Sequence, residues 1–209
     1  GDKFNRMKIA AAGVFLWSLM TAFTGMAKNF AHLIVARALI GVGESALTPN
    51  SISMLSDVYN QNKRGTASAI YYLGIPLGVG LAMLIASIFG PMFGWRAVFI
   101  SLGLIGVVLA IITYFLIEPI RGQLDNSSQN DKKSMSIREI ISLTKSTLYN
   151  SKSLTLIIIG SIFLHIPLGA GNFEVLWAVN ERGFTSSEYN SLFGIFFIVG
   201  GSIGAVLGG

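Results

Sequence analysis

Long stretches without a charged residue are the feature that most constrains how this chain can fold. An α-helix needs about 20 predominantly apolar residues to cross the ~30 Å hydrocarbon core of a bilayer. Charge-free gaps of about that length lie between Lys8 and Lys28, Arg64 and Arg96, Arg96 and Glu118, Lys152 and Glu174, and after Glu188. The spacing of the charges therefore predicts membrane-spanning helices rather than a water-soluble core.

The composition excludes several classes of soluble protein. Charged residues make up 12% of the 209 residues, against roughly 25% in soluble domains, and the mean hydropathy is +0.64. The net charge is +5, but the basic residues form short clusters between apolar runs, so nucleic acid is not an expected partner. With no Cys and only 2 His, the chain lacks the constellation of a metal site or a nucleophile, and we predict neither an enzyme nor a cofactor.

A sixth apolar segment, residues 31–55, differs from the others because it contains Arg37 and Glu44. Together the segments predict an all-α, polytopic membrane protein with spans at about 9–28, 31–55, 65–90, 95–117, 153–178 and 187–209. Four spans in residues 1–118 are separated from two in residues 153–209 by the polar segment 119–152. Its first part is rich in Asn, Ser, Asp and Gln, as flexible linkers are.

A short amphipathic helix is expected in the second part of this linker. Ser136 and Glu139 have the spacing of a capping box, in which two side chains satisfy backbone N–H groups at the start of a helix. Arg138 and Lys145 lie away from the side that carries the apolar residues Ile137, Ile140, Ile141 and Leu148. We expect this helix to lie on the cytoplasmic surface of the membrane.

The distribution of Lys and Arg predicts the side of the membrane on which each loop lies, because cytoplasmic loops collect basic residues. One set of alternate loops holds Lys3, Arg6, Lys8, Lys63, Arg64, Arg121, Lys132, Lys133, Arg138, Lys145 and Lys152. The other set holds Lys28, Arg96 and Arg182. Both ends of the chain and the linker are therefore expected on the cytoplasmic side of a cell membrane, the inner membrane if the source is bacterial.

Polar residues form a stripe on the charged span. The residues on this helical face are Arg37, Gly41, Glu44, Thr48 and Ser51. An ionisable group in mid-membrane costs at least ~2.5–3.5 kcal/mol, so both charges should face a wet cavity or a partner. We predict that Glu44 carries a proton in coupling and that Arg37, with Thr48 and Ser51, binds substrate. Alternatively, the two charges only join helices through hydrogen bonds, or Arg37 holds an anionic headgroup.

The fifth gap carries a second polar group. His165 and Asn172 share a helical face with Gly169, and Pro167, Gly169 and Gly171 are expected to interrupt the helix. Interrupted helices often line transport cavities, so His165 and Asn172 are candidate substrate-binding residues. A purely structural hydrogen bond is the alternative role for His165.

Small residues at four-residue spacing form two ridges that would let membrane helices approach closely. The first ridge comprises Gly74, Gly78, Ala82 and Ala86, and the second comprises Gly200, Gly204 and Gly208. Ordinary packing within each part of the chain is the alternative. Pro49 and Pro76 are expected to bend their helices.

Several short motifs resemble the major facilitator superfamily. Residues 1–8, GDKFNRMK, look like the latter part of the loop pattern G-x-L-x-D-R-x-G-R-R, with Asn5 in place of the usual glycine. The motifs that follow are RALIGVGES, GIPLGVG, GWR and EPIRG, the last at residues 118–122. Their order and spacing resemble the Spinster-like branch, and the resemblance runs over nearly the whole chain.

The resemblance implies a fragment with helices three to eight of a twelve-helix fold, in which two halves rock against each other. It implies that the fifth and eighth helices meet between the halves, where the packing residues would be Gly74, Pro76, Gly78, Gly200, Gly204 and Gly208. It also implies a cytoplasmic gate, formed by Asp2, Arg6, Asp57 and Arg64. A solvated basic loop is the alternative, since exposed ion pairs contribute only about 0–1 kcal/mol each.

These features predict a secondary active transporter that moves a lysolipid-like or small organic amphipathic substrate by alternating access. The resemblance implies the lipid-like substrate and a proton gradient as the energy source. An organic-anion carrier of the same superfamily is one alternative, suggested by Arg37, and a channel or receptor is an alternative of another class. The expected partners are the lipid bilayer, the substrate and helices outside this chain.

Overall fold

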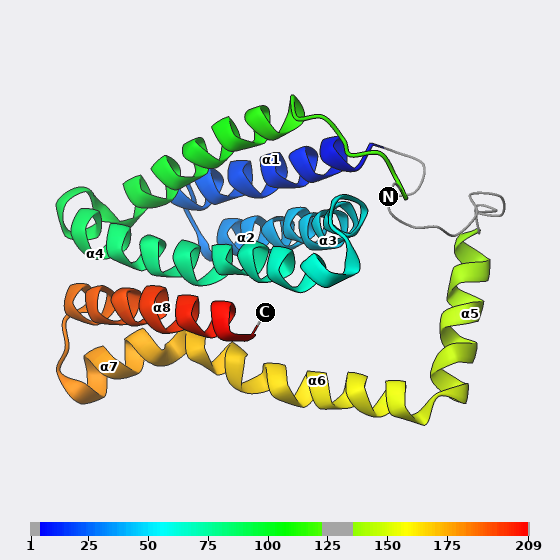
Figure 1. The fold of residues 1–209 in the computed structure, drawn as a ribbon. Coiled ribbons are helices and arrows are strands. Elements are labelled where there is room, and N and C mark those ends of the chain that lie inside the picture. The colour runs from blue at the N-terminus through cyan, green and yellow to red at the C-terminus, as the bar shows by residue number, and fades with distance from the viewer. Residues whose placement is uncertain (1–4, 123–135, 209) are drawn as a thin grey trace. The chain divides into compact units, whose positions relative to one another are not determined.

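The computed structural model describes residues 5–122 and 136–208, and the regular elements in this part of the chain are all helical (Figure 1). They are α1 (Arg6–Gly25), α2 (Phe30–Glu44), α3 (Leu47–Val58), α4 (Gln61–Tyr114), α5 (Ile137–Asn150), α6 (Lys152–Ala170), the 3-10 helix η2 (Gly171–Phe173), α7 (Glu174–Arg182) and α8 (Ser186–Gly208). The chain divides into two compact units, Gly1–Ser127 with Ser187–Gly209, and Ser128–Ser186.

The first unit has a core of small side chains and an outer surface of large apolar ones. Its buried apolar residues are Ala10, Ala11, Ala27, Ala36, Ala67, Val98 and Ala110. Large side chains point outward instead, as Phe30 and Ile117 do with exposed fractions of 75% and 91%. Soluble proteins bury such residues, whereas helices surrounded by lipid pack through small residues. The predicted all-α membrane architecture is confirmed by this arrangement.

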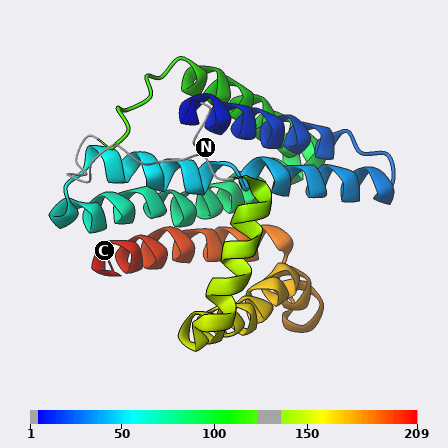
Figure 2. The same ribbon diagram turned by 90° about the vertical axis from the view of Figure 1, so that its right-hand side faces the viewer.

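Glycines let α1 touch its neighbours at the level of the backbone. A Cβ atom at Gly13 would lie 2.6 Å from the carbonyl oxygen of Gly43 on α2. On the other side of α1, a Cβ atom at Gly103 of α4 would collide with the backbone nitrogen of Ala22. Figures 1 and 2 both show α1 lying beside the later part of α4. Any larger side chain at these glycines would force the helices apart.

The predicted effect of Pro49 is visible as the break between α2 and α3. α2 ends at Glu44 and α3 begins at Leu47, so Ser45 and Ala46 separate them. Proline has no N–H for the carbonyl four residues earlier, which here belongs to Ser45, and its ring crowds that carbonyl. The two helices nevertheless form one candidate span, Phe30–Val58.

α4 is too long for a single crossing and consists of two helices. Its 54 residues would extend about 81 Å as one straight helix, more than twice the ~30 Å of a hydrocarbon core. The break lies at Gly94, where φ is 78° and ψ is 157°, a conformation open essentially to glycine alone. Figure 1 shows the ribbon of α4 reversing direction.

Length and composition identify four candidate membrane spans in the part of the chain that the structure describes. These are Arg6–Gly25, Phe30–Val58, Gln61–Tyr114 and Ser186–Gly208. A bent pair, Ile141–Asn150 with Lys152–Leu164, would be a fifth. The chain is thus a multi-pass membrane protein with four to five candidate spans, one of which contains the reversal in α4.

The second unit contains the linker helix and an interrupted helix. Ser136 and Glu139 form the predicted capping box at the start of α5: each accepts a hydrogen bond from the other's backbone N–H. The helical run after Lys152 changes to a 3-10 turn at Gly171–Phe173 before α7 begins, as predicted from Pro167 and its neighbouring glycines. The expected position of α5 on the membrane surface stays a prediction.

The backbone contact at Gly13 can be tested with a matched pair of glycine variants. We expect Gly13→Ala to destabilise the protein by about 1–3 kcal/mol, because the added methyl group overpacks the contact with α2. Gly41→Ala should be neutral or stabilising by up to about 1 kcal/mol, since none of the described atoms lies within 4 Å of a Cβ built there. Thermal unfolding of the full-length protein in detergent measures both, and equal shifts would contradict the proposed contact.

Candidate functional site

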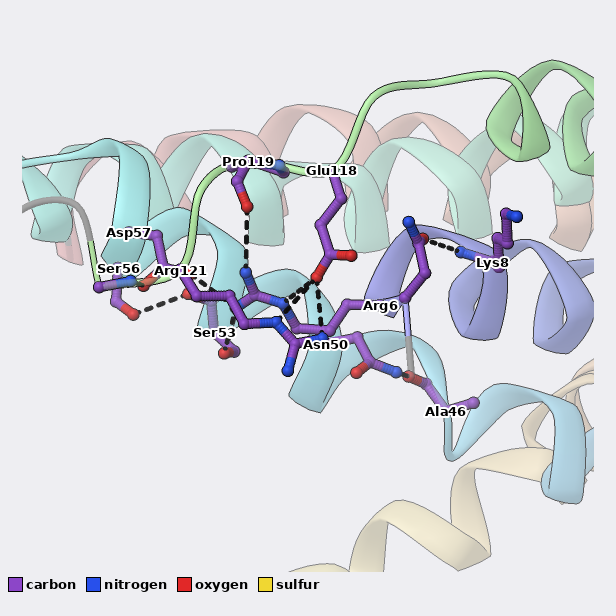
Figure 3. Close-up of polar contacts among 12 residues, drawn as sticks. Arg6, Lys8, Ala46, Asn50, Ser53, Ser56, Asp57, Glu118, Pro119 and Arg121 are labelled. Atoms are coloured by element: carbon purple, nitrogen blue, oxygen red, sulfur yellow. Dashed lines mark hydrogen bonds and ion pairs between the residues drawn. The ribbon is translucent and has the colours of Figure 1, made fainter. Parts of the chain in front are cut away.

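A buried charge cluster forms around Arg6, the first residue of α1 (Figure 3). Its Nη1 lies 2.6 Å from Oδ2 of Asp57, and its Nε lies 2.8 Å from Oε1 of Glu118. The side chains of Arg6, Asp57 and Glu118 are only 6%, 10% and 15% exposed. Charged groups with so little access to water need partners, and these three supply them to one another.

Further hydrogen bonds join this cluster to three parts of the first unit. Nη1 of Arg6 donates to Oγ of Ser53 at 2.8 Å, and Nη2 donates to the carbonyl of Pro119 at 3.4 Å. The backbone N–H of Gly122 donates to Oδ1 of Asp57 at 3.0 Å. Through these contacts, Arg6 connects the start of α1, the end of α3 and the segment that follows α4.

The cluster changes the protonation chemistry of Glu118. The hydrogen bond from Arg6 holds the pKa of Glu118 below its ordinary value of 4.5, and Arg121 acts in the same direction. Arg121 donates from Nε and Nη2 to Oε1 of Glu118, at 3.2 and 3.1 Å. Glu118 therefore remains an anion under neutral conditions and acts as a fixed counter-ion for both arginines.

Two of the four residues predicted for the cytoplasmic gate meet in this cluster, Arg6 and Asp57. Arg64 lies in the first turn of α4, and it donates to the carbonyls of Ser56 and Tyr59 at the end of α3, at 2.7 and 3.0 Å. Asp2 lies outside the described residues. Sequence reasoning missed Glu118 as a member of the cluster, although it singled out the motif EPIRG at residues 118–122 that begins with this residue.

The predicted polar stripe lies on an open face of α2 and α3. Arg37, Glu44 and Thr48 are exposed, whereas Ala36 and Gly43 are buried. Gly43 faces α1, because a Cβ atom there would lie 2.7 Å from the carbonyl oxygen of Gly13. The face that carries the charges is therefore separate from the face that packs on α1.

The stripe has two described contacts with α4. The guanidinium carbon of Arg37 lies 5.5 Å from the centre of the Phe99 ring, which is a cation–π distance. The Tyr71 hydroxyl donates to Oγ1 of Thr48 at 3.5 Å. A cation over an aromatic ring is suited to an anionic group attached to an apolar body, and the hydroxyl pair lies about three helical turns farther along the span.

The remaining candidates lie in less defined surroundings. Ser51 is half-buried on α3. His165 lies in α6 and Asn172 in η2, but the environments of their side chains lie outside what the structure describes. Their role in substrate binding remains a prediction.

α8 packs against the first part of α4 through glycine contacts, and Figures 1 and 2 both show the two helices side by side. A Cβ atom at Gly80 would lie 2.6 Å from the carbonyl oxygen of Gly194, and one at Gly201 would collide with Pro76. Pro76 thus belongs to this contact, and its predicted place between two halves of the protein stays a prediction. Among the described atoms, open space surrounds the Cβ positions of the other predicted packing residues, Gly74, Gly78, Gly200, Gly204 and Gly208.

Serine hydroxyls join the same two helices at one end of this contact. Oγ of Ser187 donates to the carbonyl of Ser87 at 2.7 Å, and Oγ of Ser191 donates to Oγ of Ser87 at 2.9 Å. Hydroxyl groups that bond across helices contribute modestly to membrane helix association. We call this contact, from Pro76 and Gly201 to Ser87 and Ser187, the α4–α8 seam.

Comparison with known proteins agrees with this architecture. The family model described as Major Facilitator Superfamily matches residues 1–209. The sphingosine-1-phosphate transporter SPNS2 of Danio rerio is 32% identical over 222 residues, which cover 100% of this chain and 44% of that protein. The probable L-galactonate transporter of Escherichia coli (strain K12) is 33% identical over 115 residues, which cover 55% of this chain and 25% of that protein.

A solved structure shows the same fold. The crystal structure of a bacterial homolog to human lysosomal transporter, Spinster, in an inward-facing and unoccupied conformation, matches with a TM-score of 0.73 and 24% identity. The match covers 99% of this chain and 47% of that one. This chain therefore spans less than half the length of these relatives.

The charge cluster makes the stability of the protein depend on pH. Because the pKa of Glu118 is lower in the folded state, its contribution is present above the ordinary value of 4.5 and is lost as the pH falls through the lowered pKa. We expect the thermal unfolding midpoint to fall with acidification in this window, and the slope to be shallower in Glu118→Gln. Glu181→Gln, which alters an exposed carboxylate on α7, should keep the original slope. Equal slopes in both variants would show that Glu118 does not contribute.

Proposed function

Because the chain belongs to the Major Facilitator Superfamily, we propose that it forms part of a secondary active transporter that works by alternating access. The family assignment confirms the predicted superfamily and the prediction that the chain is not an enzyme. The similarity to Spinster proteins agrees with the Spinster-like branch that the sequence motifs predicted. The substrate we propose is an amphipathic anion, either lysolipid-like or a small organic acid.

The observation that carries this proposal is the position of Arg37 and Glu44. Both are exposed on α2, on a different side of the helix from the glycine that packs on α1. Lipid is a poor environment for ionised groups, so a wet cavity that admits substrate is the environment that suits this face. Helices outside this chain would form the other walls of that cavity, since the relatives are about twice as long.

We propose specific roles for the polar residues. Arg37 binds the anionic group of the substrate, with Thr48 and Ser51 as hydrogen-bonding neighbours, and Glu44 carries the coupled proton. His165 and Asn172 would contribute from the interrupted helix. The relatives support an anion, since one is named as a sphingosine-1-phosphate transporter and another as a probable L-galactonate transporter.

Membership of the Major Facilitator Superfamily also suggests six spans in two groups. With α4 divided into two spans at the reversal at Gly94, residues 1–118 would hold four. The interrupted helix α6–η2–α7 and α8 would supply two more in residues 153–209. The excess of Lys and Arg in residues 119–152 favours a linker on the cytoplasmic side of the membrane. The membrane we propose is a cell membrane, which in a bacterium would be the inner membrane.

The charge cluster has a structural part in this mechanism. The described partners of Arg6 all lie within residues 53–119, so these contacts tie spans of one half together at its cytoplasmic end. A half held in this way moves as a rigid body, which alternating access requires. The α4–α8 seam is the surface on which we propose that movement occurs.

Transport by the full-length protein in proteoliposomes tests the proposed roles. With a pH gradient, Glu44→Gln should lose gradient-driven uptake but keep exchange of substrate without a gradient. Arg37→Gln should raise KM for an anionic substrate about 10- to 100-fold, because a hydrogen bond to a charged group contributes about 1.5–3 kcal/mol. Sphingosine-1-phosphate and L-galactonate, assayed separately, distinguish the two substrate classes.

The transport assay has two control variants. Glu181→Gln should transport normally, and Arg37→Lys should recover part of the affinity because it keeps the charge. Gradient-driven uptake that survives in Glu44→Gln would remove the coupling assignment. Uptake that never saturates with substrate concentration would favour a channel over a carrier.

The α4–α8 seam can be followed by the distance between spin labels at Ile88→Cys and Leu192→Cys. Replacing Ser187 and Ser191 with Ala should increase the ratio of open to closed seam about threefold per hydrogen bond, since such bonds in membranes average ~0.6 kcal/mol. Ser101→Ala is the matched control, because Ser101 bonds within its own helix to Val98. A distance distribution that does not change in the double variant would contradict a role for these hydroxyls.

A further inference from the structure

The linker helix α5 presents two different faces to its surroundings. Ile141, Thr144 and Leu148 share one side of the helix, and Ile141 is 63% exposed. Ser146 and Asn150 lie on the opposite side, where the Asn150 amide donates to Oγ of Ser146 at 3.3 Å. A helix of about 21 Å with one mainly apolar side and one polar side is suited to a boundary between lipid and water.

Basic residues lie at the border between these faces. Arg138 and Lys145 are seven residues apart, which places them on the same flank of α5, and both are exposed. Long basic side chains at this position can keep their aliphatic parts against apolar surface while the charges reach outward. The charges that would complement this flank are negative and lie at the level of lipid headgroups.

The corner between α5 and α6 is held by hydrogen bonds. Oγ of Ser151 accepts from the backbone N–H of Leu154 at 3.3 Å, and so closes the first turn of α6. Oγ1 of Thr155 donates to the carbonyls of Leu148 and Ser151 at 2.8 and 3.2 Å, which bridges the end of α5 to α6. The directions of Ile141–Asn150 and Lys152–Leu164 differ by 100°.

This corner gives α5 a defined direction relative to the apolar helix α6. If α6 crosses the bilayer, a bend of 100° places α5 close to the plane of the membrane surface. An amphipathic helix in that plane buries its apolar face at the boundary of headgroups and acyl chains. The orientation rests on the span that the proposed function assigns to α6, whereas the lipid contact itself goes beyond transport.

We propose that α5 is a docking surface for anionic phospholipid. Ile141 and Leu148 enter the acyl boundary, and Arg138 and Lys145 bind the phosphate groups of the leaflet toward which α5 points. The linker between the proposed halves is thereby attached to the membrane at its α6 end, and the strength of the attachment depends on the anionic lipid content of that leaflet.

Fluorescence quenching in the full-length protein tests this proposal without any transport measurement. A probe is attached at Ile141→Cys, Leu148→Cys or Ser146→Cys, in a background without other accessible cysteines, and the protein is reconstituted in phosphatidylcholine vesicles with or without phosphatidylglycerol. The probes at Ile141 and Leu148 should be quenched by nitroxide-labelled lipid. The probe at Ser146 should be quenched by aqueous iodide.

Charge variants then test the recognition of anionic lipid. In vesicles with phosphatidylglycerol, Arg138→Gln and Lys145→Gln should each lower the ratio of docked to undocked helix about fivefold, which corresponds to about 1 kcal/mol per basic residue. Neither variant should have this effect in pure phosphatidylcholine, and added salt should weaken it in the wild type. Lys63→Gln, an equal change of charge on α4, is the matched control.

Three results would overturn the proposal, and each differs from a failure of the transport function. Equal iodide quenching at Ile141 and Ser146 would mean that α5 is surrounded by water. Protection of Ile141 from both quenchers would mean that protein covers its apolar face. Lipid quenching that is the same with and without Arg138 and Lys145 would exclude recognition of the headgroup charge. Loss of transport with these quenching patterns intact would concern only the proposed function.

Discussion

The close approach of the α1 backbone to its two neighbours determines where the charged groups of this chain can meet. The contact of Gly13 with Gly43 fixes the antiparallel register of α1 against α2 and α3, and in that register Arg6 lies near Ser53 and Asp57. The contact of Gly106 with Ser18 fixes α1 against the later part of α4. Counted in residues, Arg6 lies as far before Ser18 as Glu118 lies after Gly106. The register that pairs Ser18 with Gly106 therefore also brings Arg6 and Glu118 together.

Two groups of charges in the first unit are stabilised in different ways. Around Arg6, carboxylates, a hydroxyl and a backbone carbonyl surround one guanidinium at the end of the helices, so the charges are compensated within the protein. Arg37 and Glu44 lie inside a span, and the described contact of Arg37 is the face of an aromatic ring. A charged group whose counter-ions come from the same protein is suited to a structural role. An exposed charged group inside a span is suited to contact with water or substrate.

Much of this architecture could be predicted from the sequence because lipid imposes simple rules on length and charge. The charge-free gaps predicted the membrane helices, Ser136 and Glu139 predicted the start of α5, and Pro167 with its neighbouring glycines predicted the interruption after α6. These features depend on local chemistry, which a sequence displays directly. The pairing of Arg6 with Asp57 came instead from the motif resemblance, since these residues are far apart in the chain.

The features that could not be predicted depend on how helices rotate against one another. α4 carries Gly74 and Gly78 on one side and Gly80 on another, and a spacing rule cannot decide which side a partner will cover. Glu118 was missed for a similar reason, because it follows the last turn of α4 and reaches Arg6 only through the register of two packed helices. Both cases require knowledge of contacts between helices, whereas capping and span length do not.

The difference between the two glycine contacts has a consequence for movement. Gly13 and Gly43 are each blocked by the backbone of the other helix, and the charge cluster reinforces the same group of helices, so separation there would leave buried charges without partners. In the α4–α8 seam, Gly194 meets Gly80, and the described polar contacts are serine hydroxyl bonds of modest energy. Separation of the α4–α8 seam would therefore break hydroxyl bonds rather than leave the described buried charges without partners, which is consistent with a rigid group of helices that moves against α8.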